Sequence, residues 1–232
     1  MRKSYIVSGV IAALFLSVGA PVGAQTPVPI TRGVDLVGTS AYLWRGFVPT
    51  DALSVQPNLW IKAGDVTLSS WGNTARPRVG GLLTEHDFTV DYTRTAGRYV
   101  VSAGWINYLF PSVDVGRYSN EFYVGVSHAS FLNPAVRVYH DVQVGAGTYV
   151  NAGVSHEFAV GRALVTPSVA VGYNRHQWIA ESTWSDALLG VKVKVPTSSK
   201  RLTLVPFVNY SRSLASGLFP SRFYGGLGVS VQ

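Results

Sequence analysis

Short segments of this chain alternate apolar and polar residues at every second position. The segment 87–93 alternates throughout, and the segments 150–158 and 189–195 follow the same pattern, with His156 as an interruption. A β-strand places such residues on two opposite faces, whereas a helix would scatter them around its axis. The alternation therefore predicts a chain built from β-strands with one apolar and one polar face.

The same period gives twelve candidate strands. Most are close to the 9–11 residues that a tilted membrane-spanning strand needs. Their predicted ranges are 33–44, 53–62, 65–74, 85–94, 98–108, 120–129, 134–142, 147–158, 163–173, 186–195, 201–211 and 222–232. Three prolines, Pro57, Pro167 and Pro206, fall inside these ranges, and each needs a bulge or a strand end because proline cannot donate to a sheet ladder.

The connections between these strands mostly alternate in length. The short ones are 62–65, 94–97 and 160–162, and the long ones include 75–84, 109–119 and 174–184. This alternation is typical of a membrane barrel with tight periplasmic turns, long extracellular loops and both termini in the periplasm. The segment 143–146 is an exception, because it is short where a long loop is expected.

The composition supports a membrane barrel over a soluble β-sandwich, the main competing fold. Charged residues make up 13% of the chain, about half the share usual in soluble domains. Beyond the N-terminal region, no uninterrupted apolar stretch reaches 18 residues. If the chain enters a membrane, it must therefore do so as a closed barrel, since hydrocarbon tolerates no unpaired backbone. We expect an all-β fold, a transmembrane antiparallel barrel of about twelve strands.

The N-terminus has the features of a cleaved signal peptide. Two basic residues precede an apolar run over 5–18 and small residues at 22–24, which is too short a run for a membrane anchor. We expect residues 1–24 to be the signal peptide and 25–232 to be the barrel, located in the bacterial outer membrane. The chain has no cysteine, which excludes disulfides and a lipid-modified N-terminus.

Aromatic residues cluster where the predicted strands would cross the outer interface. Membrane barrels carry such aromatic belts at headgroup level. The residues expected in the belt are Tyr42, Trp44, Trp71, Trp105, Tyr108, Tyr123, Tyr173, Tyr210, Phe223 and Tyr224.

Several short motifs between residues 34 and 141 resemble those of the TorF-like porin family of proteobacterial outer-membrane barrels. They are Ala41-Tyr42-Leu43-Trp44-Arg45-Gly46, Val55-Gln56, Trp71-Gly72-Asn73, Glu85-His86-Asp87, Tyr108-Leu109-Phe110-Pro111 and Glu121-Phe122-Tyr123. The resemblance implies a barrel and suggests a pore, but it supplies no solute.

The predicted strand phase places most charged residues on the inner face. A Lys or Arg in the middle of the lipid face costs about 2–4 kcal/mol, so ionic side chains should point into the lumen. The expected pore-lining residues are Arg45, Lys62, Glu85, Asp87, Asp91, Glu121, Arg137, Asp141, Glu157, Lys192 and Lys194. Acids gather in the strand 85–94 and bases in the strand 186–195, which would give either a transverse field or paired neighbours.

Two functions fit these residues. A twelve-stranded barrel is intermediate between small filled barrels and wide channels. The lumen would then be a narrow charged passage for the passive diffusion of small polar solutes. Alternatively, internal salt bridges would fill the lumen, and the barrel would be structural or adhesive, acting through its extracellular loops.

A third possibility, a lipid hydrolase, has less support. Ser127-His128 and Ser155-His156 are adjacent, so the side chains within each pair should point to opposite faces of a strand. The five histidines show no metal-binding spacing. We therefore expect no catalytic residues, no metal and no cofactor.

The expected partners follow from this location. They are outer-membrane lipid, the barrel-assembly machinery, small polar solutes and lipopolysaccharide, which the basic segment 75–78 would face. The basic excess is 19 Lys and Arg against 12 Asp and Glu and is spread along the chain without a basic run. We therefore expect no nucleic-acid partner.

Overall fold

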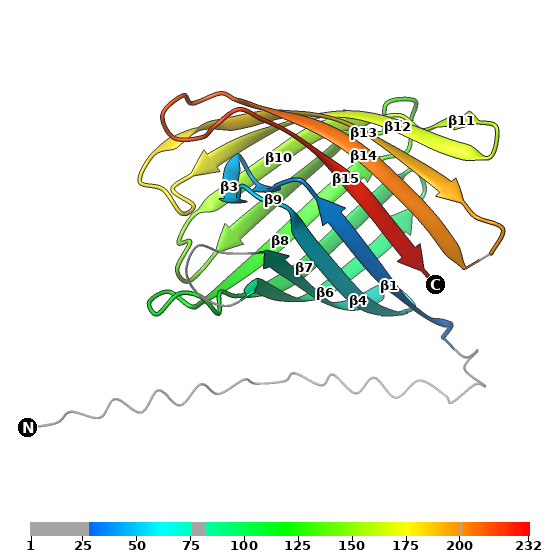
Figure 1. The fold of residues 1–232 in the computed structure, drawn as a ribbon, viewed down its shortest axis with the longest axis horizontal. Coiled ribbons are helices and arrows are strands. Elements are labelled where there is room, and N and C mark those ends of the chain that lie inside the picture. The colour runs from blue at the N-terminus through cyan, green and yellow to red at the C-terminus, as the bar shows by residue number, and fades with distance from the viewer. Residues whose placement is uncertain (1–27, 76–81, 200) are drawn as a thin grey trace, which may run out of the picture.

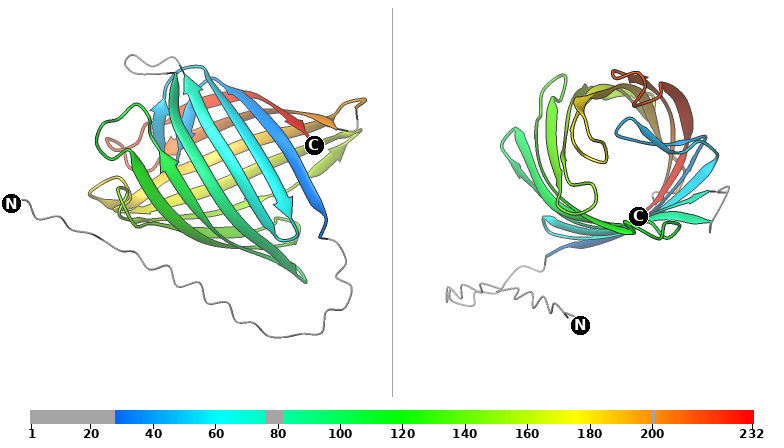
Figure 2. Two further views of the ribbon diagram at one scale, coloured as in Figure 1. Left: turned by 90° about the horizontal axis from the view of Figure 1, so that it is seen from below. Right: turned by 90° about the vertical axis from the view of Figure 1, so that its left-hand side faces the viewer.

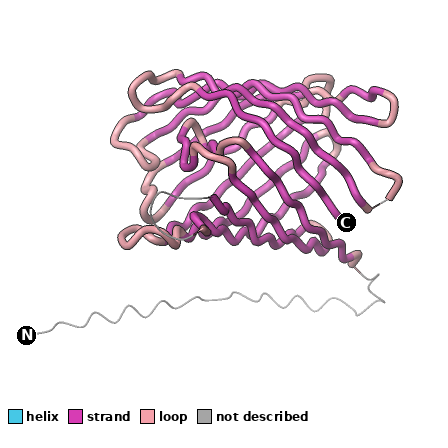
Figure 3. The backbone as a smooth tube through the Cα atoms, in the orientation of Figure 1, coloured by secondary structure: helices cyan, strands magenta, loops and turns pink. Residues whose placement is uncertain are grey.

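A computed structural model describes residues 28–75, 82–199 and 201–232, which consist of strands and loops (Figure 1, Figure 3). The strands are β1 (Ile30–Thr39), β2 (Tyr42–Trp44), β3 (Phe47–Thr50), β4 (Ser54–Ala63), β5 (Val66–Ala75), β6 (Leu83–Ala96), β7 (Tyr99–Leu109), β8 (Tyr118–His128), β9 (Ala135–Asp141), β10 (Thr148–Ser155), β11 (Phe158–Val160), β12 (Ala163–Arg175), β13 (Ser182–Pro196), β14 (Leu202–Ser213) and β15 (Arg222–Val231). Among the described residues there is no helix of the length and hydropathy needed to cross a membrane. The predicted signal peptide and most of the segment 75–78 lie outside the described residues.

The strands form a closed antiparallel cylinder. Going round it, the order is β1, β4, β5, β6, β7, β8, β9, β10, β12, β13, β14 and β15, and β15 pairs back with β1. The short strand β11 continues the wall position of β10, since both pair with β12. The views along and across the axis show this closure (Figure 2). The prediction of an all-β barrel with twelve antiparallel strands is confirmed.

The first predicted strand was wrong at its end. The sequence pattern placed one strand over 33–44, but β1 stops at Thr39, and β2 and β3 form a separate two-stranded sheet. The side chains of Ala41 and Tyr42 are buried. The prediction failed because the hairpin that follows β1 also alternates, so periodicity alone joins the two elements.

Turns and loops separate to opposite ends of the cylinder. The end that carries Ile30 and Val231, here called the turn end, has the tight turns at Gly64, Gly97 and Gly161, each with a positive φ near 60°. The opposite loop end has the described connections 40–53, 110–117, 142–147, 176–181 and 214–221. The connection 142–147 is the short one expected from the sequence.

The register sorts side chains into an apolar outside and a more polar inside. Pairs such as Asp35–Asn58 face inward, and their strand neighbours face outward. The exposed apolar residues on the outer face include Val34, Leu36, Leu59, Ile61, Leu68, Phe88, Phe122, Val124, Val126, Val136, Val169, Leu189 and Leu227. Apolar patches of this extent are rare on soluble monomers, so the outer face suits hydrocarbon.

Each proline inside a strand lies at an interrupted ladder. The β4–β5 ladder has no pair at Pro57, whereas the β1–β4 ladder is continuous there. The β13–β14 ladder likewise skips Pro206, while the β14–β15 ladder continues. Pro167 lies opposite the break between β10 and β11. Proline lacks the N–H that a complete ladder would need, and the barrel accommodates each proline with a local gap.

The expected aromatic belt is only partly present. Trp105, Tyr173, Tyr210 and Phe223 face outward, and Tyr173 packs against Trp184 at 5.3 Å between ring centroids. The other six expected members lie inside the barrel: Tyr42, Trp44, Trp71, Tyr108, Tyr123 and Tyr224. The prediction was wrong for these residues because an aromatic ring near a strand end packs equally well against a loop folded into the lumen.

Candidate pore and its inward-folded loop

The first connection at the loop end folds into the barrel. Viewed along the axis, its β2–β3 hairpin lies within the ring of strands (Figure 2). We call the segment 40–53 the inner loop. Its hairpin turns at Arg45 and Gly46, whose φ angles are 54° and 87°. Two positive φ values are the requirement of a tight two-residue hairpin turn, and this turn carries the Arg45 side chain toward the far wall.

Arg45 is clamped by a carboxylate and an amide. Its two terminal nitrogens donate to Oε2 and Oε1 of Glu121 at 2.6 Å each, and Nη1 also donates to Oε1 of Gln177 at 2.7 Å. Glu121 also accepts from the Tyr108 hydroxyl at 2.9 Å. A bidentate guanidinium–carboxylate pair is among the stronger side-chain interactions in proteins.

Three aromatic rings surround the same guanidinium. Its central carbon lies 4.0 Å from the ring centroid of Tyr139, 4.5 Å from that of Trp44 and 4.8 Å from that of Tyr149. Tyr139 and Tyr149 belong to β9 and β10. In the ring order these strands lie across the barrel from β1, from which the inner loop starts. The inner loop therefore crosses the lumen and docks on the opposite wall.

The clamp is dry. The side chains of Arg45 and Glu121 are 8% and 0% exposed. Burial acts to lower the pKa of Arg45, but the hydrogen bonds with Glu121 act in the opposite direction, and the pKa lies above its ordinary value. The guanidinium therefore stays charged at any physiological pH. Removing either partner would leave the other charge buried without compensation.

Other connections at the loop end are fixed by polar side chains that point inward. Asp141 accepts hydrogen bonds from Ser119 and from the backbone N–H groups of Gln143 and Gly145. Side chains with less than 2% exposure at this end include Gln177, Glu121, Asn73, Asn174, Asp141, Ser54, Ser119, Ser185 and Ser211. Buried polar side chains and the hydrogen bonds between them thus occupy part of the loop-end half of the lumen.

Two polar cavities remain further along the inner face. One of about 340 Å³ is bounded by Asp35, Asn58 and Trp71, among others. A second of about 210 Å³ is bounded by Arg137 and Asn151, among others. Asp35, Asn58, Trp71, Arg137 and Asn151 all point inward by register.

The structure places the expected pore-lining residues as follows. Ten of them belong to the barrel wall. Nine of these face inward by register: Lys62, Glu85, Asp87, Asp91, Glu121, Arg137, Asp141, Lys192 and Lys194. The tenth, Glu157, follows β10 and forms an ion pair with Lys194 at 3.6 Å. Arg45 lies in the inner loop, outside the predicted strand 33–44. Their role in lining a pore stays a prediction. Sequence reasoning missed Gln177, Tyr139 and Tyr149, because nothing in their local pattern reveals an inserted guanidinium.

Acidic and basic residues occupy opposite walls. The acids Glu85, Asp87 and Asp91 are on β6, and Lys192 and Lys194 are on β13, six places away in the ring of twelve. Among the described residues, no ion pair joins the two groups. The separation predicted from the sequence is therefore a separation across the lumen.

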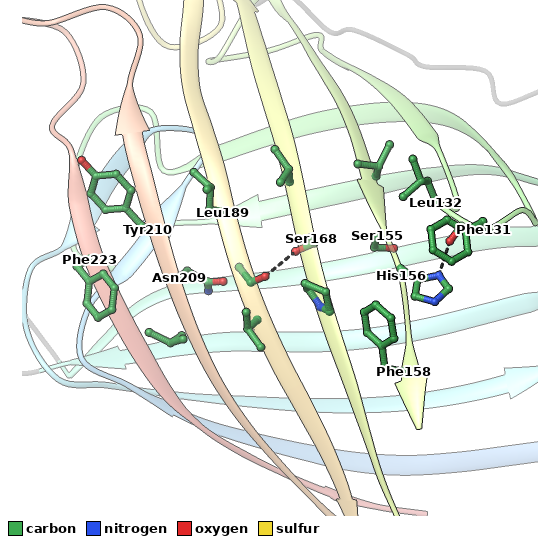
Figure 4. A pocket seen from close by; sticks show the side chains of 16 residues that line it. Phe131, Leu132, Ser155, His156, Phe158, Ser168, Leu189, Asn209, Tyr210 and Phe223 are labelled. Carbon is green, nitrogen blue, oxygen red and sulfur yellow. Dashed lines mark hydrogen bonds between the residues drawn. The ribbon is translucent and has the colours of Figure 1, made fainter. Parts of the chain in front are cut away.

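The serine–histidine pairs do not form a nucleophile with its base. His156 lies between Phe131 and Phe158 on the outer face, and its Nδ1 contacts the Phe131 carbonyl, away from Ser155 (Figure 4). These residues border a depression of about 530 Å³ in the apolar outer surface. Two Ser–His contacts exist among the described residues. Ser70 Oγ lies 2.9 Å from His86 Nε2, on the outer face by register, and Ser182 Oγ lies 3.0 Å from His176 Nε2 at the loop end.

A closed twelve-stranded antiparallel barrel with an apolar outer face and ionic residues inside defines a porin-like fold. Among solved structures, the chain is similar to the NanC porin, with a TM-score of 0.58 and 12% identity over 86% of this chain and 99% of that one. Two mutants of the Rh. blastica porin align with TM-scores of 0.38 and 0.37, at 10% and 11% identity, over 88% of this chain and 99% of theirs. No family model and no curated protein matches the chain. The similarity to the NanC porin supports the fold, and the resemblance to TorF-like porins stays a prediction.

Proposed function

We propose that this protein is a porin of the TorF-like type in the bacterial outer membrane. It lets small polar solutes diffuse passively through a narrow charged lumen. The observation that carries the proposal is the inverted polarity of a closed barrel, with exposed Leu59 and Val124 outside and ionic Asp91 and Lys192 inside. Hydrocarbon admits only helices and closed barrels, because every backbone group must be paired.

The narrowness follows from the inner loop. The loop crosses the lumen and is clamped on the far wall by Arg45 and Glu121, so a solute has to pass beside the loop or displace it. The cavities bounded by Asp35 and by Arg137 place some polar groups along the remaining path. Such a path favours small hydrated solutes over large or apolar ones.

The charge separation between β6 and β13 supports a selective passage. Acids on one wall and Lys192 on the other, which forms no ion pair within the described part of the chain, would orient a polar solute as it crosses. Rings and rows of charge at close quarters set the selectivity of many pores. The two walls should therefore discriminate by charge as well as by size.

One observation favours the second candidate, a plugged barrel that acts through its extracellular loops. Glu121, Gln177 and Asn174 are completely shielded from solvent, as expected for a filled lumen. The two candidates differ in whether the inner loop leaves a passage for ions.

Planar-bilayer recording of the refolded protein in potassium chloride separates these candidates. The porin proposal expects discrete steps of small conductance. Silence from a sample that keeps its heat-modifiable mobility in electrophoresis would refute the porin and favour the plugged barrel. A phospholipase assay on the same sample, with Ser70→Ala as the comparison, tests the hydrolase, for which we expect no activity.

A further inference from the structure

A cavity of about 620 Å³ lies at the loop end, beside the inner loop. We call it the vestibule. It is lined by the inner loop, by the segments 110–117, 142–147 and 176–181, and by Thr84 and Glu85 of β6. Its volume is within the range of about 300–1,000 Å³ that is usual for small-molecule sites.

Aromatic rings form much of the vestibule wall. Trp44, Phe47, Phe110 and Trp178 all line it. The Trp44 and Trp178 rings are 6.5 Å apart at 78°, and the Phe110 and Trp178 rings are 5.6 Å apart at 85°. Rings at right angles present faces and edges to the same space. The face of an aromatic ring attracts a cation, most strongly when the ring is that of tryptophan.

Among the described residues that line the vestibule, Glu85 is the only one with a charged side chain. Glu85 is 5% exposed, and within the described residues it forms no ion pair. Arg45 is the cation whose charge acts on it, but that guanidinium is already bound bidentately to Glu121. A buried carboxyl group without a paired cation is costly to ionise, and a positively charged occupant of the vestibule would stabilise its charged form.

Asp87, the next inward-facing residue on β6 after Glu85, is a further acidic group near the vestibule. Asp87 lies among the charges of Glu85, Glu121 and Arg45, so carboxylates outnumber cations in this group. One oxygen of Asp87 is buried and has no hydrogen-bond partner among the described residues. Among the described residues, the vestibule therefore borders a cluster in which the three acidic groups Glu85, Asp87 and Glu121 have one basic neighbour, Arg45.

We propose that the vestibule binds organic cations, meaning small ammonium compounds with an apolar or aromatic body. The rings of Trp44 and Trp178 would face the cationic group, and Glu85 would neutralise it. A neutral apolar ligand would leave Glu85 uncompensated, and an anion would be repelled. A sugar needs many hydrogen bonds, whereas the lining offers few polar groups besides Thr50, Thr84 and Ser112.

This inference deepens the proposed function and rests on it for the direction of transport. A cation held at the loop end would be captured outside the cell, before the inner loop. The carboxylates of Asp87 and Asp91 follow Glu85 along the same inward face of β6. The vestibule would thus bias a narrow passage toward cationic solutes.

The test is calorimetric titration of the refolded full-length protein with choline and with 3,3-dimethylbutanol, its neutral counterpart of the same shape. We expect saturable binding of choline and at least tenfold weaker binding of the alcohol. Glu85→Gln keeps the shape of the side chain and should weaken choline binding about tenfold. Asp114→Asn removes an exposed carboxylate from the same end of the barrel, outside the vestibule lining, and should leave the affinity unchanged.

A second variant, Trp178→Leu, should also weaken choline binding, and heat-modifiable mobility checks that each variant folds. Equal affinity for choline and the alcohol, equal weakening by Asp114→Asn, or tighter binding of glucose than of choline would overturn the inference. So would the absence of saturable binding. Potassium conductance of the same sample is a separate measurement: conductance without choline binding refutes the inference alone, and binding without conductance refutes the pore alone.

Discussion

The substitution Glu121→Gln tests whether the inner loop controls the lumen. Removing one partner of a buried ion pair typically costs about 3–5 kcal/mol. Here the introduced glutamine would keep one carbonyl that accepts from Arg45, and the rings of Tyr139 and Tyr149 would still face the guanidinium at 4.0 and 4.8 Å. We therefore expect the lower end, about 3 kcal/mol. At about 1.4 kcal/mol per tenfold change, the docked state of the loop should weaken roughly a hundredfold.

Single-channel recording in planar bilayers measures this effect directly. The wild-type protein should give small conductance steps, because the clamp holds the loop across the lumen. The Glu121→Gln variant should give larger or more frequent openings, since the loop undocks more often. Trypsin added on the side of the loops provides a second measurement: cleavage after Arg45, which is 8% exposed in its side chain, should be faster in the variant.

Asp65→Asn is the matched control. It removes a carboxylate from the pair with Arg94 near the turn end, outside the expected pore lining; the paired atoms are 3.6 Å apart, and the side chains of Asp65 and Arg94 are 42% and 65% exposed. Exposed pairs of this kind contribute about 0–1 kcal/mol, so openings should not change. Unchanged currents and cleavage in a folded Glu121→Gln variant, or equal changes in the control, would refute the clamp.

Three further predictions concern the walls and the hairpin. Lys192→Glu with Lys194→Glu should shift ion selectivity toward cations; reversal potentials under a salt gradient measure this, and an unchanged value would contradict a lumen lined by these residues. Val124 lies at the middle of β8 on the outer face, so Val124→Arg should destabilise the protein in vesicles by about 2–4 kcal/mol. Ser127 faces inward, so Ser127→Arg should destabilise it much less. Urea titration compares the two variants, and equal losses of stability would contradict the assigned faces. Gly46→Ala places a Cβ at a φ of 87° and 3.0 Å from the ring of Phe219. The variant should therefore loosen the hairpin and increase channel openings, though less than Glu121→Gln does. Unaltered openings would show that the turn is not under strain.

The barrel wall could be predicted from the sequence because each strand meets two different solvents. Residues such as Phe88 and Val90 face hydrocarbon and alternate with Thr89 and Asp91, which face the lumen. This contrast is local, so a period of two reveals it strand by strand. The ends of β4 to β15 consequently agree with the predicted ranges to within a few residues.

The inner loop could not be predicted in the same way. Tyr42 and Trp44 alternate with their neighbours as wall residues do, but their packing partners Trp71 and Tyr108 come from other parts of the ring. Whether a loop projects outward or folds inward depends on which side chains of the opposite wall can bind it. In the sequence, Gln177 is an ordinary polar residue in a loop, and only the closed barrel places it beside Arg45.

The barrel tolerates prolines inside its strands, which the period-two pattern does not predict. Pro57 and Pro206 conflict with a strand in the middle of a sheet, yet each retains a continuous ladder on one side. The interruption on the other side is confined to two residues of the strand. Closure around the ring stabilises the barrel enough to accept such gaps.

The clamp of the inner loop joins segments that are remote in the chain. Arg45 binds Glu121, 76 residues later, and Gln177, 132 residues later. The entropy of joining remote segments opposes such contacts until the intervening strands are in place. We therefore expect the centre of the nascent cylinder to stay hydrated until its first loop docks.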